Sequence, residues 1–108
     1  MRQALLLALK GDFGAAQERV PGILAKIPLS NENRHHSTYD AACIYALARN
    51  SSEALKWLKE TAATGFPNYP LFERDPFLDR IRQAPDFIQF MADQKAQWEK
   101  LRQEFDRS

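Results

Sequence analysis

The feature that most constrains the fold is an internal repeat, in which two stretches of the chain align at one constant offset. The aligned pairs are Ala4 and Ala42, Leu7 and Tyr45, Ala16 and Ala54, and Val20 and Leu58. In each copy we expect a helix, a tight turn and a second helix, with a small residue where the two helices cross. A repeat of this kind predicts helix hairpins that bury their apolar faces by stacking on one another.

Apolar residues recur at helical spacing, and no stretch sustains the alternation of a β-strand. The spacing predicts helices over 2–10, 12–28, 34–48 and 50–65, and further helices that start near 75 and 84. Gly11 is a natural helix stop. Asp12, Asn50 and Asp75 are expected to cap the helices that follow them, and Asn50 has Glu53 at capping-box spacing. The proline-rich segment 65–70 is expected to be irregular. The sequence therefore predicts an all-α fold.

Composition excludes several classes of protein. The 108 residues include 15 Lys and Arg against 14 Asp and Glu, so the positive charge expected of a nucleic-acid-binding protein is missing. Lys10 and Asp12 interrupt the apolar start too early for a secretory signal, and no stretch is long enough to span a membrane. With a single cysteine, the chain is expected to be cytoplasmic.

These residues resemble the tetratricopeptide repeat (TPR) family. The family's pattern falls on Ala42, Tyr45, Arg49, Ala54 and Leu58 in the second copy, and on Ala4, Leu7, Gly11, Ala16, Val20 and Pro28 in the first. The resemblance implies antiparallel helix pairs, as in a fragment of a right-handed α-solenoid. Arg49 departs from the pattern by replacing the turn glycine, and Thr61 departs from it by replacing an alanine. The spacing between the copies is also longer than the family's usual period of about 34 residues. The first copy lacks the start of its first helix.

The region after the second copy is similar to the segment that closes repeat arrays in bacterial proteins. Its motif runs from Gly65-Phe66 through Asp75-Pro76 and Leu78 to Pro85 and Phe87. One domain is therefore expected, with a truncated repeat at 1–28, a second repeat at 34–64 and a helical C-terminal cap at 65–108. The resemblance implies the C-terminal part of a larger bacterial regulatory protein, working as a non-catalytic protein–protein interaction module.

The leucine-rich start of the chain is one expected interaction surface. About three repeats are normally needed for a stable stack, and this chain has fewer than two. Leu5 and Leu9 belong to a run of leucines that no preceding helix covers. Either the chain is a piece of a longer array, or this end associates with a partner protein or with a second copy.

The concave groove that the resemblance implies is a second expected surface. It would be lined by Tyr39, Cys43 and Leu47, whose apolar character suits a helix or a hydrophobic peptide. Alternatively, the last helix fills this groove from within. Its apolar stripe from Phe87 to Phe105 is expected either to pack back on the domain or to pair with a neighbouring copy. A different function is also open, namely a regulatory ligand-binding pocket near Tyr39, Trp57 and Tyr69.

No group of residues points to catalysis. His36, Asp40 and Cys43 share one helical face, but structural zinc sites prefer more cysteines than this chain has. His36 lies nearly two helical turns from Cys43, too far to act as its base. We therefore expect no metal, no cofactor and no enzymatic activity.

Overall fold

The computed structural model describes residues 1–64 and 69–107, and every regular element in these ranges is a helix. The α-helices are α1 (Arg2–Leu9), α2 (Phe13–Ala25), α3 (Arg34–Leu47), α4 (Ser51–Ala63), α5 (Tyr69–Arg74) and α6 (Pro85–Arg107), and a 3₁₀ helix, η1, spans Pro76–Ile81. No strand occurs in the described part of the chain. The predicted all-α fold is confirmed.

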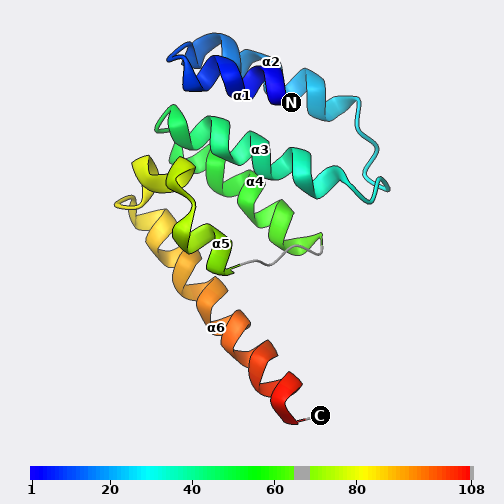
Figure 1. Cartoon of the computed structure of the whole chain (residues 1–108), viewed down its shortest axis with the longest axis vertical. Coiled ribbons are helices and arrows are strands. Elements are labelled where there is room, and N and C mark those ends of the chain that lie inside the picture. The colour runs from blue at the N-terminus through cyan, green and yellow to red at the C-terminus, as the bar shows by residue number, and fades with distance from the viewer. Residues whose placement is uncertain (65–68, 108) are drawn as a thin grey trace.

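The helices form successive layers (Figure 1). Helices α1 and α2 form one antiparallel hairpin, and α3 and α4 form the next. Helix α3 is central, because α1 and α2 pack on one side of it and η1 packs on another. Helix α6 lies against α4 and α5, and its C-terminal half extends beyond the rest of the molecule.

The two hairpins have the same turn at equivalent positions of the repeat. In the first, the Gly11 amide donates to the Ala8 carbonyl and the Asp12 amide to the Leu7 carbonyl. In the second, the Arg49 amide donates to the Ala46 carbonyl and the Asn50 amide to the Tyr45 carbonyl. This is the Schellman pattern, which needs a left-handed residue after the helix. Gly11 (φ 92°) and Arg49 (φ 63°) both adopt that conformation.

Of the three predicted N-terminal caps, two form side-chain capping bonds and one does not. The Asn50 side chain accepts the Glu53 amide and the Asp75 side chain accepts the Phe77 amide, as expected of caps. Asp12 occupies the cap position but makes no side-chain capping bond. The expectation of irregular structure over 65–70 is wrong at Tyr69 and Pro70, which begin α5, because proline is tolerated in a first helical turn. Residues 65–68 lie outside the described residues.

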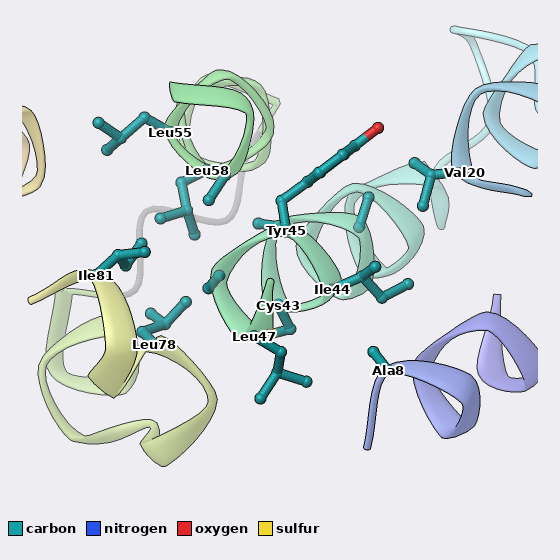
Figure 2. Close-up of a cluster of buried hydrophobic side chains, with 14 of the residues drawn as sticks. Ala8, Val20, Cys43, Ile44, Tyr45, Leu47, Leu55, Leu58, Leu78 and Ile81 are labelled. Carbon is teal, nitrogen blue, oxygen red and sulfur yellow. The ribbon is translucent and has the colours of Figure 1, made fainter. Parts of the chain in front are cut away.

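The core is built around α3, whose residues 41–47 are all buried. Figure 2 shows Ile44 pointing to the side where Ala8 and Val20 lie, whereas Leu78 and Ile81 lie on the other side of α3. The small residues of the repeat, Ala4, Ala42, Ala16 and Ala54, are fully buried. Small side chains at these positions let the helices of each hairpin approach closely.

A buried polar pair joins α3 to α4. The hydroxyls of Thr38 and Thr61 are 2.7 Å apart, and both residues are fully buried. The Thr61 hydroxyl also lies 2.7 Å from the Trp57 carbonyl, and the Thr38 hydroxyl lies 3.1 Å from the His35 carbonyl, so each hydroxyl has a backbone acceptor beside its threonine partner. These bonds satisfy both buried hydroxyls, so Thr61 is accommodated where the repeat pattern has an alanine.

Two arginines donate hydrogen bonds to backbone carbonyls near the ends of helices. Arg34, which is buried, donates to the carbonyls of Leu24 (3.0 Å) and Ile27 (2.8 Å) at the end of α2. Its Nε is 3.2 Å from the Glu60 carboxylate of α4. Arg80 of η1 donates to the Leu47 carbonyl at 2.7 Å. These bonds add donors to carbonyls at or just beyond the helix ends, where intrahelical partners run out.

Within residues 1–64 and 69–107, no helix is both long enough and apolar enough to cross a membrane.

Candidate interaction surfaces

The outer face of α1 carries exposed leucines. Leu6 is 54% exposed and Leu9 is 49% exposed, although both are large aliphatic residues. Leu6 lines a shallow hollow of about 220 Å³ together with Gln3, Leu7, Lys10 and Arg19. The polar residues of this lining include two cations and no acid, so the apolar face has a basic rim. This α1 face is the first candidate surface.

The residues predicted to form interaction surfaces lie in different environments. Leu9 is exposed on the α1 face, but Leu5 points into the core and is 7% exposed. Cys43 and Leu47 are buried in α3, and Tyr39 is half-buried. The structure thus places only Leu9 of the five where a partner can reach it without rearrangement of the chain.

The groove-lining positions of α3 are covered by the closing segment. The Tyr39 ring stacks on Phe72 of α5 at a centroid distance of 5.8 Å, and Phe72 is fully buried. The Tyr39 hydroxyl donates to Asp75, the residue that caps η1. Helix α5 and η1 therefore fill the space that was expected to be either an open groove or the seat of the last helix.

The tyrosine and cysteine of this region are held in their neutral forms. Burial, followed by the hydrogen bond to Asp75, raises the pKa of Tyr39 well above its usual value. Burial and then the negative charge of Asp75 raise the pKa of the Cys43 thiol. A cysteine nucleophile needs a lowered pKa, so the Cys43 thiol is in an environment of the opposite kind.

The apolar stripe of α6 is packed over only part of its length. Phe87 and Phe90 are buried, and their rings lie 6.4 Å apart. Further along the same face, Leu101 is 49% and Phe105 is 83% exposed. These two residues, with Trp98 and Arg102, line an open hollow of about 370 Å³. The exposed half of this stripe is the second candidate surface.

The three aromatic residues considered for a ligand pocket have separate surroundings. Tyr39 bonds Asp75, and the Tyr69 hydroxyl donates to Glu73 at 2.5 Å. Trp57 lies beneath the Lys56 ammonium, 5.0 Å from its ring centre, and its indole nitrogen is buried with no hydrogen-bond partner. Neither of the two hollows described above is lined by any of the three, so a shared ligand pocket stays a prediction.

The sequence predicts that His36, Asp40 and Cys43, the possible metal ligands, share one face of α3. In the described part of the chain, no group of three or more His, Cys, Asp and Glu side chains could hold a metal ion. Asp40 is half-buried, and this burial raises the pKa of its carboxyl group, while the positive charge of Arg2 acts in the opposite direction.

The leucine run predicted as an interface includes Leu6, but the site residues singled out there, Leu5 and Leu9, leave out Leu6, which is the most exposed leucine of α1. The repeat alignment does not single it out, because residues 41–47, the counterparts of residues 3–9, are all buried in α3. The run of leucines does not single it out either, because leucines lie on several faces of α1.

No family model matches the chain, and no solved structure matches it. It is similar to a chloroplastic protein from Arabidopsis thaliana, with 26% identity over 87 residues. The aligned region covers 81% of this chain but 26% of that protein, so the chain spans about a quarter of the length of its curated relative.

Proposed function

We propose that the chain is a non-catalytic interaction module of the tetratricopeptide type and forms part of a longer protein. It would bind a protein partner or a second copy through exposed apolar helix surface. The observation that carries this proposal is the pair of hairpins whose turns have identical hydrogen bonds at equivalent positions of the repeat. Repeats of this kind stack on one another and present extended binding surfaces.

The α1 face supports the proposal through its composition. Two leucines one helical turn apart, each about half exposed, form an apolar patch with a polar rim, which is the character of a contact site. The exposed half of the α6 stripe supports the proposal independently, since apolar residues at helical spacing match the face of another amphipathic helix.

The test is a comparison of binding by two versions of the chain, the wild type and the Leu6→Glu/Leu9→Glu variant. Both leucines are exposed, so the variant is expected to keep the wild-type helix content and unfolding midpoint. A photo-crosslinking residue at Lys10, beside the leucines, identifies the partner, and one at Gln83, an exposed residue outside α1, serves as the control.

The proposal predicts a protein that crosslinks from Lys10 and not from Gln83. With purified components, or with the chain alone in the case of self-association, its binding should weaken at least tenfold in the variant. Equal binding by the wild type and the variant would exclude the α1 face. Failure to bind any protein would contradict the proposed function as a whole.

A further inference from the structure

A third hollow, of about 310 Å³, lies between the C-terminal end of α4 and the middle of α6, two helices that pack against each other. Its apolar lining consists of Phe90, which is buried, and of Ala62 and Ala63. The other lining residues are polar, namely Gln94 and Gln97 of α6 and one charged residue from each helix. All of these residues belong to α4 or α6, so the hollow is separate from the α1 face and from the groove positions of α3.

The side-chain amide of Gln94 has no hydrogen-bond partner, although the residue is buried. Gln94 is only 9% exposed, and its amide bonds no residue in the described ranges 1–64 and 69–107. The amide is not sealed off either, because Trp57 Nε1 is the fully enclosed side-chain atom that lacks a partner in these ranges. The amide of Gln94 is thus reached from the hollow that the residue lines. Buried polar groups normally have a partner, so this arrangement suits a ligand that supplies one.

The chemistry of the Gln94 amide indicates what kind of ligand fits. A glutamine amide offers one acceptor oxygen and a donor NH₂ group. In an extended peptide, the N–H and the C=O of one residue point to the same side, as they do between paired β-strands. One extended residue can therefore donate to the Gln94 oxygen and accept from the Gln94 nitrogen. An α-helix cannot do so along its length, because its N–H and C=O groups are bonded to one another.

The rest of the lining indicates the side chains of such a segment. The buried ring of Phe90 suits an apolar side chain. Lys59 on α4 and Asp93 on α6 carry opposite charges, and the Asp93 carboxylate accepts a hydrogen bond from the Gln89 amide at 3.0 Å. Lys59 is exposed and has no ion-pair partner in the described part of the chain. This cation favours an acidic side chain on the α4 side of the hollow.

We propose that the hollow between α4 and α6 binds an extended peptide segment of a partner protein, in which the N–H and the C=O of one residue bond the Gln94 amide. An apolar side chain of the segment lies against Phe90, and an acidic side chain approaches Lys59. This inference rests on the proposed function, because its ligand belongs to another protein. It adds a site that neither the α1 face nor the exposed half of the α6 stripe contains.

The experiment starts from a displayed library of random peptides of about twelve residues. Peptides that the wild-type chain retains and Gln94→Leu does not retain are synthesised with blocked ends, and fluorescence anisotropy measures their affinities. Gln103→Leu is the matched control, because it makes the same substitution at an exposed position of α6 outside the hollow. A scan that methylates one peptide nitrogen at a time removes the N–H donors singly. The NMR signals of the Gln94 NH₂ group report contact directly.

We expect peptides to pass this selection and to bind Gln94→Leu at least tenfold more weakly than the wild type, because two hydrogen bonds in a largely enclosed position are lost. Gln103→Leu should bind them as the wild type does. Methylation of one particular peptide nitrogen should weaken binding at least tenfold, and the Gln94 NH₂ signals should shift. Lys59→Glu should weaken binding about threefold, the size of an exposed charge pair.

The free Gln94→Leu chain provides an independent check. Because the amide has no partner in the folded chain, its removal should leave the unfolding midpoint at or above that of the wild type. A lowered midpoint would show that the amide is already bonded within the fold, which would contradict the inference.

The inference is also wrong if no peptide passes the selection, or if Gln103→Leu weakens binding as much as Gln94→Leu. Loss of binding on methylation at every internal nitrogen would indicate a helical ligand, and unchanged binding by Lys59→Glu would refute the acidic contact. If the peptides fail while a partner still depends on Leu6 and Leu9, the proposed function stands without this site. If the peptides bind as described and no partner depends on the two leucines, the α1 face is excluded and this site remains.

Discussion

At the scale of single residues, Arg49 is the clearest point of backbone strain. It occupies the left-handed region (φ 63°) in a turn whose counterpart uses Gly11. A side chain with a Cβ costs about 1 kcal/mol in this conformation. The side chain of Arg49 is exposed, so burial in the core does not offset this cost.

Arg49→Gly should therefore raise the free energy of unfolding by about 1 kcal/mol. Urea unfolding followed by circular dichroism measures the change. Arg49→Ala is the matched control, because it removes the guanidinium but keeps the Cβ, and it should stay within about 0.5 kcal/mol of the wild type. Gly11→Ala should destabilise by about 1 kcal/mol, since no atom lies within 4 Å of the added Cβ and only the backbone conformation is strained. A stabilising effect of Arg49→Ala equal to that of Arg49→Gly would refute the explanation.

The raised pKa of Tyr39 should make the free energy of unfolding decrease at alkaline pH. Its pKa is raised in the folded chain by burial and by Asp75, so the unfolded chain loses the phenolic proton first as the pH rises. This contribution to stability is fully present below the unfolded pKa of about 10 and is lost above it, by about 1.4 kcal/mol per pH unit.

Tyr39→Phe should lower stability at pH 8 by about 2 kcal/mol, because the Asp75 carboxylate loses a hydrogen bond from Tyr39. Between pH 9.5 and pH 11, however, the variant should lose less stability than the wild type. Burial raises the pKa of Tyr45 as well, but Tyr45 is present in both chains, so its effect cancels in the comparison. Parallel pH profiles would show that Tyr39 does not titrate as described.

At the scale of the elements, α6 is two segments with different surroundings. Its first half packs on α4 and α5, where the Phe90 ring lies 6.0 Å from the ring of Phe72. Its second half continues the same apolar stripe into solvent. The regular apolar spacing of the helix does not by itself reveal where packing stops.

Phe90→Ala should cost about 3 kcal/mol or more, because it leaves a cavity among buried aromatic rings. Leu101→Ala, on the exposed half of the same stripe, should change the free energy of unfolding by less than about 0.5 kcal/mol. The two variants are compared by thermal and urea unfolding. Similar losses for both would mean that the second half of α6 packs on the body of the protein.

Much of the helical layout could be predicted from the sequence, and the reasons for the failures are local. The caps at Asn50 and Asp75 were readable because a cap acts over two or three residues. The bond between Tyr39 and Asp75 was not, since its partners are far apart in the sequence and only the tertiary fold brings them together. Helix α5 was missed because Pro70 was interpreted as a helix breaker, whereas it lies in a first turn.

The burial of the predicted site residues could be predicted less well than the fold. The run of leucines in α1 has no polar face, so its periodicity does not separate Leu5, which is buried, from Leu6, which is exposed. The predicted groove residues Cys43 and Leu47 are buried because other elements, η1 among them, cover α3. The coverage of one helix by a distant segment depends on packing that single-sequence patterns do not contain.

At the scale of the whole molecule, the chain is a stack with one open layer. Helix α3 has neighbours on both sides, namely the hairpin of α1 and α2 and the closing element η1. Helix α1 packs on α2 and α3 and leaves its outer leucines exposed. Stability in such stacks comes from the interfaces between adjacent layers, so the layer with fewer interfaces should open more readily.

Amide hydrogen exchange on the wild-type chain tests this account most directly, because the repeat supplies matched positions. The pairs are Leu5 and Cys43, Leu6 and Ile44, and Leu9 and Leu47. We expect each α1 amide to be at least about tenfold less protected than its partner in α3, since local opening needs less free energy where fewer contacts are lost. Equal protection of the two helices would contradict the claim that the outer face of α1 is an open layer.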